Sequence, residues 1–113
     1  KPDFLFPNGK CYRNIQFPAG DLIVLGAKTT CKDRWRQVLT EADRVDVKFL
    51  FTLQQGISKN QLKEMHDSRL TLVVPQKYIS SFPRDYQDEI KDLLGFILMV
   101  KEKQEHLPKH YFL

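Results

Sequence analysis

Three short runs of consecutive apolar residues predict the buried strands of this chain. Runs of this length that contain β-branched and aromatic side chains are typical of strands covered on both faces. They lie at residues 22–25, within a strand expected over 21–28, at 47–53, and at 70–74, where Pro75 ends the run. Two weaker strands are expected at 3–6 and 11–17, separated by the turn-forming sequence Pro7-Asn8-Gly9.

Helical spacing of apolar residues predicts three helices, over residues 32–45, 58–65 and 85–106. Thr29 or Thr30 is expected to cap the first helix and Ser58 the second. The core-facing stripe of the first helix consists of Trp35, Val38, Leu39, Ala42 and Val45. The stripe of the third helix consists of Tyr86, Ile90, Leu93, Leu94, Ile97 and Leu98. This alternation predicts an α/β fold with a mixed central β-sheet, flanked by helices and with an antiparallel hairpin at its front.

Composition and charge indicate a single globular domain with a basic net charge and no membrane span. With 113 residues, 42% of them hydrophobic, the chain is expected to form a single domain over 1–113. Its first residues, Lys1-Pro2-Asp3-Phe4, resemble the interior of a domain, so we expect a partial domain that is truncated at its N-terminus. No apolar run approaches the roughly 20 residues of a membrane span. Eighteen Lys and Arg against fourteen Asp and Glu give a net charge of +4, which permits a polyanionic partner.

The cysteines and histidines do not form a recognisable metal site. Cys11 and Cys31 lack the spacing of metal ligands, and the absence of a secretory segment favours reduced thiols in a cytoplasmic protein. The three histidines are scattered and are expected at the surface; they are His66, His106 and His110.

Three charged residues are expected to meet at one end of the sheet. Asp3 begins a strand, Lys28 ends the strand that should pair with it, and Glu41 projects from the following helix. Two carboxylates from separate elements can hold a hard cation such as Mg²⁺ in a site that keeps several waters. The metal would activate a water for attack on phosphorus, and the Lys28 ammonium would orient it and neutralise a phosphate oxygen. The alternative is that the three residues have no catalytic role. Asp3 would then be a turn residue, Glu41 a solvated residue of the helix, and Lys28 a surface lysine.

A longer resemblance supports the first interpretation. Pro2-Asp3 followed by a strand-terminal Lys28 is similar to the PD-(D/E)xK nuclease motif, although Gly26 stands where an acid usually lies. The segments that extend the similarity are 2–7, 51–54, 72–75 and the block Leu25-Gly26-Ala27-Lys28-Thr29-Thr30-Cys31-Lys32-Asp33-Arg34-Trp35-Arg36-Gln37. Together they closely resemble the C-terminal catalytic domain of EcoRII-type type II restriction endonucleases. In that branch the third acid has moved to the following helix, and Glu41 occupies the matching place.

The resemblance implies a restriction-endonuclease-like fold and a defined activity. The expected reaction is Mg²⁺-dependent cleavage of double-stranded DNA at a CC(N/W)GG-like site, leaving a 5′-phosphate. Asp3, Lys28 and Glu41 would be catalytic, with Asp3 and Glu41 as metal ligands. A homodimer is expected, because protein symmetry then matches a near-palindromic site. The resemblance also implies a cytoplasmic bacterial or archaeal protein, without a membrane partner or nucleotide cofactor, and an opening helix and strand missing from this fragment.

Lys32, Asp33 and Arg34 are the candidates for reading DNA bases. Lys or Arg donates to guanine O6 and N7, and Asp accepts from cytosine N4. Two donors around one acceptor therefore suit two consecutive C·G pairs, and a matching triplet makes such contacts in related CCGG-reading enzymes. The alternative is a polar first turn of the predicted helix, although the helix dipole disfavours basic residues there.

Tyr12, Arg36 and Gln54 are weaker candidates. Tyr12 could attack phosphate directly, assisted by Arg13 and Arg36, and would then form a covalent protein–DNA adduct. Gln54 follows a strand beside the one that carries Lys28, where it would contact DNA or form a plain turn. Two other functions stay open: a sequence-specific DNA-binding module without cleavage, and a nickase of the same fold that cuts one strand at a mismatch.

Overall fold

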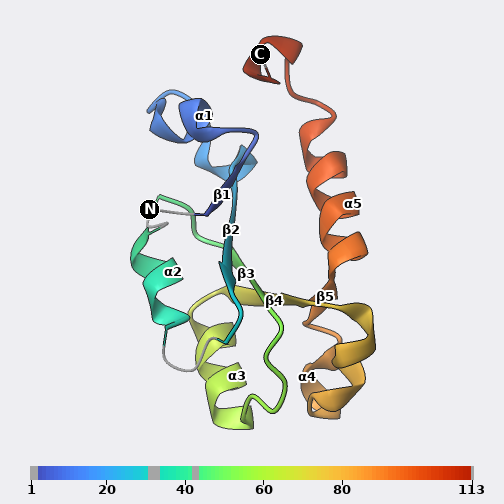
Figure 1. Cartoon of the computed structure of the whole chain (residues 1–113). Helices are drawn as coiled ribbons and strands as arrows, with labels where there is room; N and C mark the ends of the chain where they lie inside the picture. The colour runs from blue at the N-terminus through green and yellow to red at the C-terminus, as the bar shows by residue number, and fades with distance from the viewer. Residues whose placement is uncertain (1–2, 31–33, 42–43, 113) are drawn as a thin grey trace.

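A five-stranded mixed sheet forms the centre of the computed structural model, which describes residues 3–30, 34–41 and 44–112 (Figure 1). The strands are β1 (Phe4–Phe6), β2 (Ile23–Lys28), β3 (Lys48–Thr52), β4 (Leu70–Val74) and β5 (Lys91–Asp92). Their order in the sheet is their order in the chain. β1 runs antiparallel to β2, and the other neighbours are parallel. The predicted α/β class and mixed sheet are therefore confirmed, whereas the front antiparallel pair is formed by β1 and β2, with a helix between them, and not by a hairpin of strands 3–6 and 11–17.

The three apolar runs form the central strands, as predicted. Leu50 in β3 lies between Gly26 of β2 and Leu72 of β4 in the strand register. Leu50 and Val73 are completely buried, although they point to opposite faces of the sheet. Continuous apolar runs are needed here because helices cover both faces.

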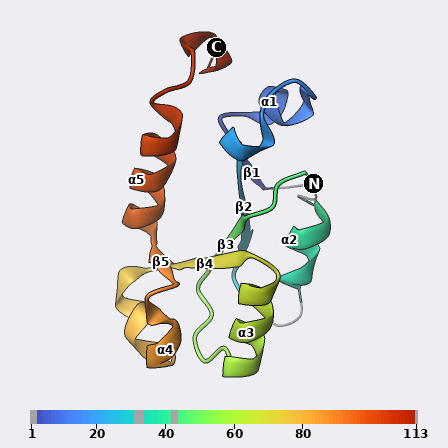
Figure 2. The same ribbon diagram turned by 180° about the vertical axis from the view of Figure 1, so that it is seen from behind.

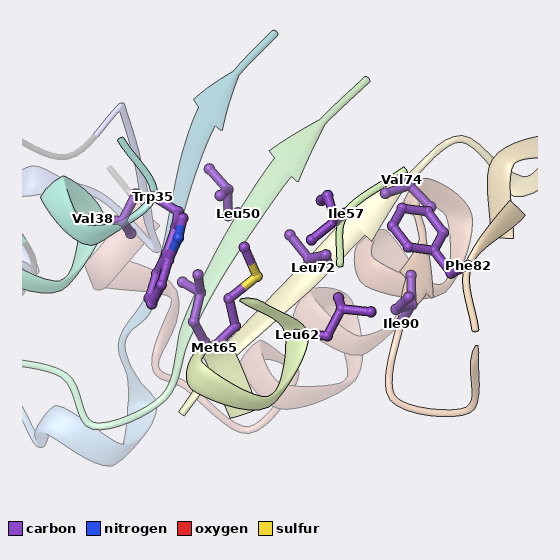
Figure 3. Packing of buried hydrophobic residues seen from close by; sticks show 11 residues of the cluster. Trp35, Val38, Leu50, Ile57, Leu62, Met65, Leu72, Val74, Phe82 and Ile90 are labelled. Atoms are coloured by element: carbon purple, nitrogen blue, oxygen red, sulfur yellow. The ribbon is translucent and has the colours of Figure 1, made fainter. Parts of the chain in front are cut away.

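The helices divide between the two faces of the sheet (Figures 1 and 2). One face, with Leu50 and Leu72, packs against Trp35, Met65 and Phe82 in the cluster that Figure 3 shows. The elements on this side are α2 (Arg36–Glu41), α3 (Lys59–Asp67), the 3₁₀ helix η2 (Gln76–Ser81) and α4 (Arg84–Gln87). The opposite face packs against α5 (Leu93–Gln104). Helix α3 confirms its predicted cap, since the Ser58 hydroxyl accepts a 3.2 Å hydrogen bond from the backbone N–H of Gln61.

The strand predicted over 11–17 is wrong, because the chain forms the short helix α1 (Gly9–Arg13) there. Asn8 begins this helix, and its side-chain oxygen accepts a 2.9 Å hydrogen bond from the Cys11 N–H. The guanidinium of Arg44 donates to the carbonyl oxygens of Cys11, Tyr12 and Phe17. A 3₁₀ helix, η1 (Ala19–Asp21), then leads into β2. The segment thus satisfies its carbonyls through an arginine instead of a strand neighbour.

Helix α2 is shorter than predicted. It begins at Arg36 and its last described residue is Glu41, whereas the prediction extended from 32 to 45; residues 31–33 and 42–43 lie outside the described part. Thr29 and Thr30 form a bend well before the helix, so the predicted cap is wrong. Trp35 lies in the core as expected, with 1% of its surface exposed.

The single long helix predicted over 85–106 is also wrong. The segment is divided into α4, the two-residue strand β5 and α5, because residues 91–92 pair with the edge of β4. Asp92 restarts the helix: its carboxylate accepts a 2.6 Å hydrogen bond from the Gly95 N–H. The restart changes the buried face, so that Phe96 and Val100 enter the core. The residues of the predicted stripe that are instead exposed are Leu93, Leu94, Ile97 and Leu98.

The histidines lie at the surface. His66, His106 and His110 are exposed, as predicted; His66 contacts Glu89, and His106 lies 3.2 Å from Asp21. Across the residues that the structure describes, no helix combines the length and apolar character needed to span a bilayer.

Candidate active site at the ends of strands β2 and β3

Asp3 lies against β2 and contacts Ala27, the residue that precedes Lys28. The register pairs Phe4 with Leu25, so Asp3 lies just beyond the last residue pair of the antiparallel β1–β2 ladder. Its Oδ2 atom accepts a 2.8 Å hydrogen bond from the backbone N–H of Ala27. Because one carboxylate oxygen is held by the backbone, the other has a defined direction on an exposed side chain. The structure therefore brings together the carboxylate and the lysine that the sequence singled out.

Lys28 starts from the sheet face that carries α2. A Cβ atom built at Gly26 would point at Val38 of α2, and side chains two residues apart in a strand share one face. Lys28 is half-buried, and its register partner in β3 is Thr52. Within the described part of the chain, its ammonium forms no ion pair with a carboxylate. The Lys28 ammonium is thus a cation next to Asp3 that can bind an anionic ligand, because no carboxylate of the described residues pairs with it.

Glu41 is placed only by its backbone. It is the last described residue of α2, three positions after Val38, and its side chain lies outside the described part. Helix α2 runs alongside β2 in both views (Figures 1 and 2). The helix that carries Glu41 is consequently adjacent to the strand that carries Lys28.

A hard cation would find a suitable ligand in Asp3. An exposed carboxylate with one oxygen already oriented is the kind of donor that Mg²⁺ takes together with several waters. Within the described ranges, no three His, Cys, Asp or Glu side chains gather as a metal-binding group. Asp3 therefore fits a water-rich Mg²⁺ site as one ligand, and Glu41 is the second carboxylate that the sequence predicts.

A buried hydroxyl at the end of β3 was missed by the sequence reasoning. Thr52 has 0% exposure, and its Oγ1 donates to the Thr29 carbonyl oxygen at 3.2 Å. The same oxygen accepts from the backbone N–H of Gln54 at 3.1 Å. Its signal was weak, since threonine is common in strands and here simply ends an apolar run. Gln54 itself is half-buried in the loop after β3, at the same end of the sheet as Lys28.

The candidate base-reading residues fall before α2. Arg34 is exposed in the turn that precedes the helix, while Lys32 and Asp33 lie outside the described part. Arg36 is engaged within the protein: its guanidinium pairs with Glu64 of α3 and lies 4.4 Å from the Trp35 ring centroid. Of Arg34 and Arg36, Arg34 is therefore the one that is exposed without an ion pair to the described residues.

Tyr12 lies far along the sheet from Lys28. It belongs to α1, which follows β1 and precedes β2, whereas Lys28 ends β2. Its ring is half-buried against an apolar cluster and lies 5.9 Å from the Arg44 guanidinium. The neighbouring Cys11 is buried, and this burial raises the pKa of its thiol. These positions do not bring Tyr12 and Arg36 into one site with Asp3 and Lys28.

Comparison with known proteins adds an independent observation. The family described as EcoRII C terminal matches residues 1–97. A curated relative, the type II restriction enzyme EcoRII of Escherichia coli, is 47% identical over 97 residues, which are 86% of this chain. The chain spans 24% of the length of that relative.

Two solved structures share the fold. Metal-depleted Ecl18kI in complex with uncleaved, modified DNA superposes with a TM-score of 0.78 and 18% identity, covering 94% of this chain and 36% of the other. A second structure, metal-depleted Ecl18kI with uncleaved DNA, gives a TM-score of 0.67 and 17% identity, covering 77% and 30%. The restriction-endonuclease-like fold predicted from the sequence is thereby confirmed. With the family matched over most of its residues, this chain belongs to the EcoRII C-terminal family.

Proposed function

We propose that the protein containing this chain is a Mg²⁺-dependent type II restriction endonuclease. It would hydrolyse phosphodiester bonds of double-stranded DNA at a CC(N/W)GG-like site and leave a 5′-phosphate. The observation that carries the proposal is the hydrogen bond between Asp3 and Ala27, which holds a carboxylate next to Lys28 at a strand end. Membership of the EcoRII C-terminal family and the name of the 47% identical relative support the same reaction.

The proposed roles follow from the chemistry of each side chain. Asp3 would hold Mg²⁺ through the oxygen that Ala27 does not engage, and spacing of three residues from Val38 would turn Glu41 toward the same strand. The metal, when bound, would supply Lewis acidity and a water of lowered pKa. The Lys28 ammonium would neutralise a non-bridging phosphate oxygen and orient the attacking water. Attack in line would form a bond from water oxygen to phosphorus and break the bond to the 3′ oxygen, which leaves as a hydroxyl.

Recognition would use the segment that links β2 to α2. Arg34 would donate to guanine in the major groove, and Lys32 and Asp33 would complete the reading of consecutive C·G pairs. Since this segment follows Lys28 directly, base reading and cleavage would be fixed relative to one another. We further propose a homodimer on the near-palindromic site, a single catalytic domain over residues 1–113, and a cytoplasmic location in a bacterium or archaeon.

The decisive experiment is cleavage of plasmid DNA by the intact protein, with Mg²⁺ and with EDTA, followed by sequencing of the ends. Metal-dependent double-strand breaks at a CC-N-GG-like site would support the proposal and identify the central pair. Specific binding without cleavage would indicate a DNA-binding module, and single-strand breaks at mismatches a nickase. A covalent protein–DNA adduct would instead implicate Tyr12.

A further inference from the structure

We propose that Thr52 is a positioning residue for this active site. Its buried hydroxyl holds the chain that follows Lys28 against the end of β3. The inference rests on the proposed nuclease function, because the group that is positioned is the Lys28 ammonium. Thr52 and Lys28 are register partners at the ends of neighbouring parallel strands.

The hydroxyl of Thr52 makes two hydrogen bonds, both to backbone groups at the end of β3 that lies beside Lys28. It donates to the carbonyl of Thr29, the residue after Lys28, at 3.2 Å. It accepts from the N–H of Gln54, two residues further along its own chain, at 3.1 Å. A hydroxyl that is completely buried is costly without such partners, so both contacts are maintained in the folded protein. The side chain thus connects the two segments that leave the sheet beside the candidate site.

The residues on both sides of Lys28 are held by hydrogen bonds, one to Asp3 and one to Thr52. The residue before it, Ala27, donates its N–H to the Asp3 carboxylate from the β1 side. The residue after it, Thr29, is held through its carbonyl oxygen by Thr52 from the β3 side. Lysine has a long, flexible side chain, and within the described residues no carboxylate pairs with the Lys28 ammonium. The position of the ammonium therefore depends on the backbone that these two anchors fix.

Fixing the backbone around Lys28 should affect the rate of DNA cleavage more than the affinity for DNA. A displacement of about 1 Å in a catalytic group can cost roughly 100-fold in rate, whereas DNA affinity is spread over many phosphate contacts. A hydroxyl that served only to satisfy buried backbone groups would change stability and leave the turnover of the folded enzyme unchanged. The two roles consequently give different kinetic results.

The test compares Thr52→Val, which keeps the shape and removes the hydroxyl, with Thr52→Ser, which restores the hydroxyl. Thr71→Val in β4 is the matched control, since it makes the same change on a neighbouring strand, at the opposite end of the sheet from Lys28. In the intact protein with saturating Mg²⁺, Thr52→Val should lower kcat for DNA cleavage by about 10- to 100-fold, with KM within about two-fold of wild type. Thr52→Ser and Thr71→Val should stay within about three-fold of the wild-type kcat.

Folding is monitored in the same samples by thermal unfolding, and hydrogen exchange of the Gln54 amide reports the loss of the hydroxyl contact. If Thr52→Val cleaves like wild type, or loses activity only in proportion to its unfolded fraction, the positioning role is overturned while the nuclease function stands. The same holds if Thr52→Ser fails to restore kcat although it is folded. If wild type itself does not cleave, the proposed function is overturned and the inference falls with it.

Discussion

Strand β2 and helix α2 touch at Gly26 and Val38. A Cβ atom at position 26 would lie 2.7 Å from Val38 Cγ2 and 3.6 Å from Leu50 Cδ1. The first distance is shorter than any ordinary van der Waals contact, so a side chain here would force the helix away from the strand. An acid at this position, as in the common PD-(D/E)xK pattern, is therefore incompatible with this packing. In the proposed active site the third acid would then come from another element, and α2 lies alongside β2 at this contact.

Replacing Gly26 with alanine should consequently destabilise the fold. Overpacking of a close contact typically costs about 1–3 kcal/mol, and we expect a loss of unfolding free energy in that range. Urea denaturation measures it, and combining Gly26→Ala with Val38→Ala should recover part of the loss because the two residues are in direct contact. Gly20→Ala is the control, since a Cβ at Gly20 meets nothing within 4 Å. Equal effects of the two glycine substitutions would contradict the packing argument.

Removing the lysine or either carboxylate should abolish cleavage and leave specific DNA binding partly intact. For Lys28→Ala, Asp3→Asn and Glu41→Ala we expect kcat to fall by at least about 100- to 1,000-fold, because each removes a group that stabilises developing charge or holds the metal. Plasmid cleavage and gel-shift titration with Ca²⁺ in place of Mg²⁺ separate the two effects. Lys10→Ala is the matched control, since Lys10 is exposed on α1. Parallel loss of binding and cleavage in all three variants would indicate a damaged fold instead.

Arg34 and Arg36 should behave differently although they are two residues apart. Arg34→Ala should weaken discrimination at one guanine by about 1–3 kcal/mol. Arg36→Ala should leave discrimination unchanged and lower stability by roughly 0–1 kcal/mol, since it removes an exposed pair with Glu64. Competition binding with sites substituted at single base pairs measures discrimination, and denaturation measures stability. A shift in base preference for Arg36→Ala alone would reverse the assignment.

The contact between α3 and α4 should depend on pH. A hydrogen bond from Lys59 lowers the pKa of Asp85 below its ordinary value, so the folded state releases this proton more readily than the unfolded state. The stabilisation is then present above the ordinary carboxyl pKa and is lost as pH falls through the lowered one. The difference in urea midpoint between wild type and Asp85→Asn should therefore shrink between pH 7 and pH 3 and should also shrink in high salt. A difference that is constant with pH would contradict this coupling.

Sequence patterns predicted the parts of the fold where one physical effect dominates. β2, β3 and β4 were found because strands buried on both faces need uninterrupted apolar residues. Asp3 and Lys28 were predicted to meet because antiparallel pairing places the start of one strand beside the end of the other. The predictions failed where a local contact overrides periodicity: Asn8 starts α1 in place of a strand, and Asp92 restarts a helix after β5.

Thr52 marks the limit of sequence reasoning at the candidate site. Its importance comes from a partner 23 residues away, Thr29, and no local pattern encodes that distance. The predicted cap at Thr29 or Thr30 failed for a related reason, since the Thr29 carbonyl is engaged by β3 and the helix begins only at Arg36. Residues that act through long-range backbone contacts are visible only once the register of the sheet is known.

The agreement between strand order and chain order has a consequence for how the domain forms. Each strand from β2 onward pairs with the strand synthesised just before it, so every ladder closes a loop of limited length. A nascent chain leaving the ribosome can therefore extend the sheet at a single growing edge, without inserting a late strand between earlier ones. The inner strands β3 and β4 are then open edges, on which other chains could assemble, only until the next strand is synthesised.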